Sequence, residues 1–177
     1  MTYEETLHYL YTSIPVFQHS GASTYKPGLD TSIALDNYLG NPHKAYKTIH
    51  VAGTNGKGSV SHLLAAILRQ AGYKVGLFTS PHLIDFRERI RVNGKMIPQE
   101  YVVDFVERHR TTFEPLHPSF FELTSTMAFD YFRAEKVDFA VIEVGMGGRL
   151  DSTNIITPIL SIITNISLDH TQFLGDT

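Results

Sequence analysis

The sequence predicts an α/β fold: one domain over residues 1–177, with a mostly parallel sheet flanked by helices. Two patterns predict it. Apolar runs without polar alternation, typical of parallel strands covered on both faces, are separated by segments of helical periodicity. One of these runs leads through a glycine-rich loop into a helical segment. An apolar content of 42% and a charged content of 19% in 177 residues fit a single globular domain with a sizeable core.

Two helices are predicted near the N-terminus. Thr2 and Glu5 fit a capping box at the start of the first helix. Its apolar residues follow at helical spacing: Tyr3, Leu7, Leu10 and Tyr11. A loop containing Ser, Gly and Pro is predicted over 13–30, and Asp30 is placed to cap a second helix, which the "GNP" of 40–42 ends. The apolar positions of this second helix are Ile33, Leu35 and Tyr38.

The next part of the chain predicts a strand, a helix and another strand. The two strands are expected over 46–52 and 74–80. Between them, apolar residues at helical period predict a helix that starts near Ser59 and is closed by Gly72. Its apolar residues are Val60, Leu63, Leu64, Ile67, Leu68 and Ala71.

A long charged loop is predicted over 81–98, and two helices follow it. Within the loop, Asn93-Gly94 suits a type I′ turn between the two arms of a hairpin. Pro98 opens the first helix, and the second is expected from about 119 to 135. The apolar side of the first carries Val102, Phe105, Val106 and His109, and that of the second Phe120, Leu123, Thr124, Met127, Ala128 and Tyr131.

Two more apolar strands, over 138–145 and 159–166, complete the predicted sheet. Both lack clean alternation, which indicates that both of their faces are covered. The order of strands and helices is that of an α/β protein, and no internal repeat is present.

Composition excludes several classes of protein. A net charge of −3 argues against a broad nucleic-acid surface. The absence of cysteine excludes a disulfide scaffold and a thiolate metal site. No apolar run reaches the ~18 residues of a membrane span, and the polar, acidic N-terminus is unlike a secretory signal. We therefore expect a cytoplasmic protein with no nucleic-acid or membrane partner.

The glycine-rich loop, "GTNGKG" at 53–58, is the main candidate site. Backbone N–H groups at a helix N-terminus bind phosphate, and glycine lets the backbone approach the phosphate oxygens. Lys57 can reach the β- and γ-phosphates. The usual phosphate-loop spacing is G-x-x-x-x-G-K-[ST], whereas here Ala52 replaces the first glycine and Gly58 the Ser or Thr. The alternative is a glycine-rich turn before a core helix.

Three other polar groups follow predicted strands, at the edge where open parallel sheets bind ligands. Ser80 follows one strand, Glu143 ends another, and Asp169 and His170 follow a third. Oxygen ligands such as Glu143 and Ser80 suit Mg²⁺, whereas His170 is a less usual ligand. Structural roles remain open for each: a paired core carboxylate, a turn serine and a structural histidine.

Further patterns leave a choice between binding and structure. The "GMGGR" of 145–149 lacks full dinucleotide-fingerprint spacing, so NAD binding is rejected. The "RERIR" of 87–91 offers arginines that could grip carboxylates or could form a solvated hairpin surface. Phe121 and Glu122 point away from the apolar face of their helix and are therefore freer to bind a ligand.

Taken together, these motifs resemble one family. "HVAGTNGKGSV", "TSPHL", "RERIRVNG", "SFFE", "IEVGMGGRLDSTN" and "DHTQFLG" occur in the order seen in the folylpolyglutamate synthase/dihydrofolate synthase family, a branch of the Mur ligase superfamily. The resemblance covers the whole chain and includes the unusual glycine loop. It implies a P-loop NTPase-like Mur ligase ATP-binding domain.

The resemblance implies an ATP-dependent acid–amino-acid ligase with Mg²⁺. The enzyme would add L-glutamate to a folate, or to dihydropteroate, through an acyl phosphate. The residues implied to hold ATP are Thr54, Asn55, Gly56, Lys57, Gly58 and Ser59. Those implied to hold the metal are Ser80, Glu143 and His170, with Lys57, Glu143 and His170 in catalytic roles. Those implied to contact the pterin side of the substrate are Phe121, Glu122, Leu150, Asp151 and Ser152.

Family members continue past the residue that corresponds to 177, so we expect this chain to be a truncated N-terminal ATP-binding part. It would lack the C-terminal glutamate-ligase domain and, alone, be inactive in ligation. At full length we expect a monomer. Two alternatives remain: a Mur-type ligase of cell-wall peptides, and a nucleotide-binding domain without ligase chemistry.

Overall fold

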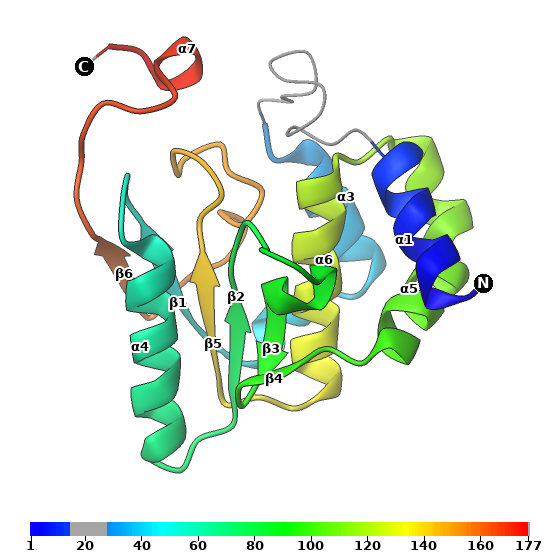
Figure 1. Ribbon diagram of the computed structural model, residues 1–177, viewed down its shortest axis with the longest axis horizontal. Helices are drawn as coiled ribbons and strands as arrows, with labels where there is room; N and C mark the ends of the chain where they lie inside the picture. Colours follow the sequence, from blue (N-terminus) through cyan, green and yellow to red (C-terminus); the bar gives the residue numbers. More distant parts are fainter. Residues whose placement is uncertain (15–27, 177) are drawn as a thin grey trace.

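The computed structural model describes residues 1–14 and 28–176 and contains a six-stranded sheet of order β4-β3-β2-β5-β1-β6 (Figure 1). The strands are β1 Lys47–Ala52, β2 Val75–Phe78, β3 Ile90–Val92, β4 Lys95–Met96, β5 Phe139–Glu143 and β6 Leu160–Ile163. β2, β5, β1 and β6 run parallel, and the β3–β4 hairpin is antiparallel at one edge. The predicted α/β class with a mostly parallel sheet is confirmed.

Helices cover both faces of this sheet. They are α1 Tyr3–Thr12, α3 Asp30–Tyr38, α4 Lys57–Gln70, α5 Gln99–Phe113, α6 Phe120–Ala134 and α7 Thr171–Leu174. Short 3₁₀ turns are η2 Pro42–Ala45, η3 Phe86–Arg89 and η4 Glu114–Leu116. α4 packs on β5, β2 and β1 from one side, and α6 lies on the other with α3 and α5 against it and α1 against α5 (Figure 1).

The core has one cluster on each side of the sheet. Successive residues of a strand face opposite sides, so Leu77 packs under α4 while Phe78 packs under α6. The α6 cluster is much the larger and includes Phe86, Met127 and Phe132. α6 is buried all along its middle because the sheet, α3 and α5 enclose it. The two core clusters thus fix the strands between them, and the strands fix the positions of the loops at their ends.

Local sequence signals are confirmed at two predicted positions and wrong at a third. The capping box of Thr2 and Glu5 is formed. Asn93 and Gly94 both have positive φ, 49° and 81°, as the type I′ turn requires. Asp30, however, is the first helical residue of α3, and Leu29 is the N-cap without a side-chain bond. The predicted loop over 13–30 lies mostly outside the described residues.

The predicted apolar face of α4 is only partly buried. The helix begins at Lys57 rather than near Ser59. Val60, Leu64 and Leu68 pack on the sheet, whereas Leu63 and Ile67 are 63% and 64% exposed. α4 therefore lies against the sheet along the stripe of Val60, Leu64 and Leu68, and Leu63 and Ile67 fall on its exposed flank.

The prediction that both faces of 159–166 are covered is also wrong. β6 is shorter, Leu160–Ile163, and three of its four residues are exposed. β6 is exposed because it is the edge strand of the sheet, and it pairs with β1 alone among the described residues. Within residues 1–14 and 28–176, every helix is too short or too polar to cross a membrane.

Candidate active site

Four loops meet at the carboxyl end of the parallel strands. They follow β1, β2, β5 and β6, and hydrogen bonds join the first loop to the fourth and the second loop to the Glu143 side chain at the end of β5. Thr54 N–H donates to Asn165 O at 3.0 Å, and Ser80 N–H donates to Glu143 Oε2 at 2.9 Å. The glycine loop, Ser80 and Glu143, which were predicted after separate strands, are therefore gathered at one edge of the sheet, as the topology requires.

The glycine loop between β1 and α4 has a shape that only glycine allows. Gly53 has φ +132°, and a Cβ there would lie 2.0 Å from Thr164 Oγ1. Gly56, at φ +83°, is the N-cap of α4 and offers no side chain to its first turn. The 14-residue α4 therefore presents its N-terminal N–H groups, with the helix dipole behind them, to the space above the loop.

The segment after β6 fixes this loop in place. Thr164 Oγ1–H donates to Asn55 O at 2.6 Å, and Asn55 N–H donates to Asn165 Oδ1 at 2.9 Å. Thr54 Oγ1 bonds Ser167 through both its carbonyl and its N–H. The predicted binding residues Thr54 and Asn55 thus serve first to hold the loop.

Lys57 lies over the loop that precedes it. Its Nζ donates to Gly53 O at 2.8 Å and to Thr54 O at 3.2 Å. Both acceptors are neutral carbonyls of the loop, and no ion pair among the described residues includes Lys57. Ser59, in the first turn of α4, is exposed, and Gly58 is half-buried.

Glu143 is the acidic group of the site. It ends β5, is 3% exposed, and its Oε1 lies 3.6 Å from the position that a Cβ on Gly58 would take. Burial raises the pKa of the Glu143 carboxyl, and the Ser80 N–H and the positive charge of Lys57 act in the opposite direction. The carboxylate therefore occupies the space beside the missing Ser or Thr of the usual phosphate loop.

The third predicted metal residue, His170, is not joined to these two by any described contact. It is the N-cap of α7 at φ 47°, is exposed, and its N–H donates to Asp169 Oδ1. Among the described residues, no group of three or more His, Cys, Asp or Glu is arranged to hold a metal ion. Its metal role stays a prediction.

Of the two α6 residues predicted to be free for ligand, Glu122 is not. It is 5% exposed, and its Oε2 accepts from Ser119 N–H at 2.7 Å in a capping box with Ser119 Oγ. Phe121 is half-buried: its ring is 5.6 Å from that of Phe78, and a Cβ on Gly145 would come within 2.6 Å of it. Helical periodicity could not distinguish a free carboxylate from a capping one.

Asp151, a predicted substrate residue, is the centre of a buried network. Its Oδ2 accepts from Gly145 N–H and Met146 N–H, both at 2.9 Å, and its Oδ1 accepts from Thr153 Oγ1–H at 2.5 Å. Thr153 Oγ1 in turn accepts from His50 Nε2–H at 2.8 Å. Burial raises the pKa of Asp151 and lowers that of His50 to about 4.

This network shapes the loop after β5, and sequence reasoning missed His50 and Thr153. No local signal pairs them, because they are 103 residues apart. Of the neighbouring predicted residues, Leu150 is exposed and Ser152 is buried against Ser125, with 3.3 Å between their hydroxyl oxygens.

The arginines of 87–91 have different environments. Arg87 is paired with Asp85 at 2.6 Å. Arg89 is 4% exposed, donates through Nε to His82 Nδ1 at 2.6 Å, and lies 5.2 Å from the Phe120 ring centre. Arg89 belongs to no described ion pair, and its buried charge lies close enough to Glu143 to lower the pKa of that carboxyl.

The comparisons with known proteins bear directly on this site. The model of the Mur ligase middle domain matches residues 51–177, from the end of β1 onward. The chain belongs to the Mur ligase family. Within the family, the dihydrofolate synthase/folylpolyglutamate synthase of Bacillus subtilis is 45% identical over 159 residues, covering 86% of this chain and 37% of its own length. The folylpolyglutamate synthase of Lacticaseibacillus casei is 40% identical over 185 residues, covering all of this chain and 41% of its own length.

Solved structures of Mur ligases agree. An FPGS–AMPPCP–folate complex superposes with a TM-score of 0.90 at 39% identity, covering all of this chain and 43% of the other. E. coli FolC in complex with DHPP and ADP superposes with a TM-score of 0.87 at 35% identity, covering 41% of that chain. The chain thus spans about two fifths of the length of these relatives. Those two complexes contain an ATP analogue and ADP, ligands of the kind predicted for the glycine loop.

Proposed function

We propose that the protein binds ATP with Mg²⁺ on the glycine loop and uses it to ligate L-glutamate to a folate or to dihydropteroate. The observation that carries the proposal is the pairing of this loop with a buried carboxylate beside it. Relatives named as folylpolyglutamate and dihydrofolate synthases support the choice of reaction.

The nucleotide phosphates would lie against the N-terminus of α4. The N–H groups of Gly56, Gly58 and Ser59 suit phosphate oxygens, and Lys57 can exchange its two carbonyl acceptors for phosphate. The positive φ angles of Gly53 and Gly56 keep the loop open for this close approach.

The donor set beside the loop fits a hard divalent cation. Glu143 and the Ser80 hydroxyl supply oxygens, and His170 would complete the set if the segment after β6 brings it close. When bound, Mg²⁺ supplies charge neutralisation to the phosphates. A bound cation would favour the charged form of the buried Glu143 carboxyl, opposing the burial that raises its pKa.

The acceptor substrate would lie over the loops after β2 and β5. The half-buried ring of Phe121, at the edge of these loops, suits an aromatic pterin. Leu150 is exposed and free to contact the substrate, whereas Glu122, Asp151 and Ser152 would act by shaping the pocket.

The chemistry follows from this placement. A substrate carboxylate oxygen attacks the γ-phosphorus of ATP. The bond from the γ-phosphorus to the bridging oxygen breaks, ADP leaves with that oxygen, and an acyl phosphate forms. The amine of L-glutamate then attacks the acyl carbon, phosphate leaves, and the amine loses a proton. Phosphoryl transfer needs positioning and charge neutralisation above all, which Lys57 and the loop N–H groups provide.

Calorimetric titration of ATP with Mg²⁺ tests the proposal. We expect binding that Lys57→Ala weakens by more than tenfold and that dihydropteroate or tetrahydrofolate strengthens. Lys44→Ala, an exposed lysine on η2, is the matched control and should bind ATP as the unmodified protein does. Folded protein without ATP binding, or with affinity strengthened only by a nucleotide-sugar peptide, would contradict the folate assignment.

A further inference from the structure

Arg89 is a buried cation that no carboxylate neutralises. It is the last residue of η3, immediately before β3, and it is 4% exposed. Burial lowers the pKa of its guanidinium, because the charged form loses its hydration. Among the ion pairs of the described residues, none includes Arg89. A buried charge costs free energy unless it is paired, so this guanidinium is suited to receive an anion.

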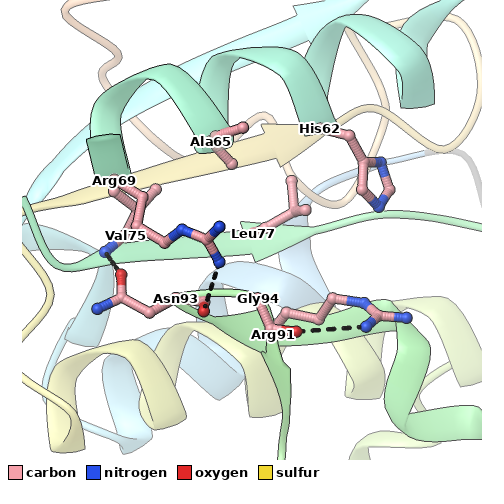
Figure 2. Close-up of a pocket in the computed structure, with 9 residues that line it drawn as sticks. His62, Ala65, Arg69, Val75, Leu77, Arg91, Asn93 and Gly94 are labelled. Carbon is pink, nitrogen blue, oxygen red and sulfur yellow. Dashed lines mark hydrogen bonds between the residues drawn. The ribbon is translucent and has the colours of Figure 1, made fainter. Parts of the chain in front are cut away.

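The two neighbouring arginines of the segment have other partners and are only half-buried. Arg87 is paired with Asp85 at 2.6 Å. Arg91 lines a groove of about 390 Å³ between α4 and the β3–β4 hairpin, where its Nη1 donates to Gly94 O at 3.5 Å (Figure 2). Arg89 is therefore distinct within the "RERIR" segment in being buried and in lacking both kinds of partner.

The guanidinium of Arg89 is held in one orientation by three aromatic side chains. Its Nε–H donates to His82 Nδ1 at 2.6 Å, and its central carbon lies 5.2 Å from the centre of the Phe120 ring. Because arginine nitrogens only donate, His82 carries its proton on Nε2, which donates to the Tyr11 hydroxyl oxygen at 3.2 Å. The Tyr11 ring in turn stacks on Phe120 at 5.4 Å. These contacts form a closed set around the guanidinium.

The contacts engage only one edge of the Arg89 guanidinium. Its Nη1 and Nη2 donate to no residue within 1–14 and 28–176. In that part of the chain, the buried side-chain polar atoms without a hydrogen-bond partner are Ser32 Oγ and Ser61 Oγ, so both Nη groups of Arg89 retain contact with solvent. The two parallel N–H groups at the end of a guanidinium match the two oxygens of a carboxylate.

Arg89 is tied to the candidate active site through its backbone and its ring contact. Its carbonyl accepts from Thr79 N–H at 3.0 Å, and the next residue along, Ser80, donates its N–H to Glu143 Oε2. The positive charge of Arg89 correspondingly lowers the pKa of the Glu143 carboxyl. The helix whose first residue contacts the guanidinium also carries Phe121, on which the acceptor ring was placed above. Arg89 thus belongs to the same side of the sheet as the proposed acceptor substrate.

We propose that the Nη groups of Arg89 bind the carboxylate of the acceptor substrate, the group that attacks the γ-phosphorus. That carboxylate and the γ-phosphate are both negative, and a fixed guanidinium opposes their repulsion without transferring a proton. His82 acts as a positioning residue, since it holds the guanidinium through Nε. The inference rests on the proposed function for the identity of the acceptor, and on Arg89 for the preference for a carboxylate.

Calorimetric titration of dihydropteroate and of its carboxamide analogue tests the proposal, because the amide keeps the shape and removes the charge. We expect the protein to bind the carboxylate about tenfold or more tightly than the amide. Arg89→Gln should abolish that preference with the affinity for the amide retained. Arg91→Gln, an equal loss of charge in the same segment, should keep the preference.

Two further variants keep the test independent of folding defects. Arg89→Met replaces the buried charge by an apolar chain of similar length, and it should lose the preference as Arg89→Gln does. His82→Leu removes the acceptor of Nε, and it should lower the preference in part at unchanged affinity for the amide. Unfolding curves establish that each variant is folded.

Three results would overturn the proposal: a preference retained in both Arg89 variants, an equal loss in Arg91→Gln, or no binding of dihydropteroate to the folded protein. Titration of ATP with Mg²⁺ into the unmodified protein separates this inference from the proposed function. ATP binding without a preference for the carboxylate would remove the role of Arg89 and leave the ligase standing. A preference for the carboxylate without ATP binding would support Arg89 and contradict the ligase.

Discussion

At the scale of single residues, the site depends on positions that accept only one type of residue, in some cases only glycine. Gly53 is the clearest, since a Cβ there meets Thr164 Oγ1 at 2.0 Å on backbone of φ +132°. The contact is with the segment after β6, so residue 53 joins two loops more than one hundred residues apart. The glycine loop is therefore fixed by the sheet order as much as by its own sequence.

Gly53→Ala should displace the loop from the segment after β6. We expect a loss of about 1–3 kcal/mol in the free energy of unfolding, from left-handed backbone strain and steric overlap, and ATP affinity reduced by more than tenfold. Urea unfolding and calorimetry measure the two effects. Gly148→Ala is the matched control, because nothing lies within 4 Å of a Cβ there. Equal effects from both variants would contradict this account of the loop.

His50 should make stability depend on pH. Its pKa is about 4 in the folded protein, lowered by burial, against 6.5 when exposed. Between these values the unfolded chain binds more protons, so stability is full above pH 6.5 and falls as pH is lowered toward 4. The loss from this residue is about 3 kcal/mol, at about 1.4 kcal/mol per pH unit.

Urea unfolding between pH 7 and pH 4 measures this slope. His50→Gln retains an N–H donor for Thr153 without a titrating group, so its slope should be shallower over that range. His8→Gln, at an exposed position on α1, is the control and should keep the original slope. A slope unchanged in His50→Gln would show that other groups carry the pH dependence.

At the scale of elements, residues 1–14 and 28–176 use the same device three times to start helices. Capping boxes are formed by Thr2 with Glu5, Asp85 with Glu88, and Ser119 with Glu122. The last begins α6, the most buried helix of the described chain, and its N-terminus supports Phe121 at the candidate substrate pocket. The cap therefore links local sequence to the geometry of the site.

Removal of this cap should destabilise the protein with little loss of packing. Ser119→Ala removes the acceptor of Glu122 N–H, and we expect a decrease of about 1 kcal/mol in the free energy of unfolding. Ser119→Thr keeps the hydroxyl and should retain most of the stability. Chemical unfolding of the two variants measures the difference, and equal stability would contradict a role for the cap.

Local signals were enough to predict most elements from the sequence. Helical period, the Asn93-Gly94 turn and the glycine loop each act within about ten residues, and each is confirmed in position. What failed depends on distant partners. The sheet beneath α4 determines which residues of that helix are buried. Asp151 is hydrogen-bonded within its own loop and, through Thr153, is linked to the distant His50. Periodicity carries no information about such contacts.

At the scale of the whole molecule, the two edges of the sheet are treated differently. The β4 edge ends in a charged hairpin whose turn bonds Arg69 of α4. The β6 edge carries apolar side chains that are largely exposed, among them Ile159, Leu160 and Ile163. An unpaired, apolar strand edge is a template for association with another strand or sheet.

The 177-residue chain should therefore associate through β6 as its concentration rises. Ile163, 64% exposed at the end of the strand, is the residue to change, since a lysine there adds a charge that opposes edge pairing. We expect Ile163→Lys to shift sedimentation profiles toward the monomer. Ile33→Lys, at an isoleucine 44% exposed on α3, adds the same charge away from the edge and should leave association unchanged. If both lysines reduced association equally, net charge would be the cause, and β6 would have no part in it.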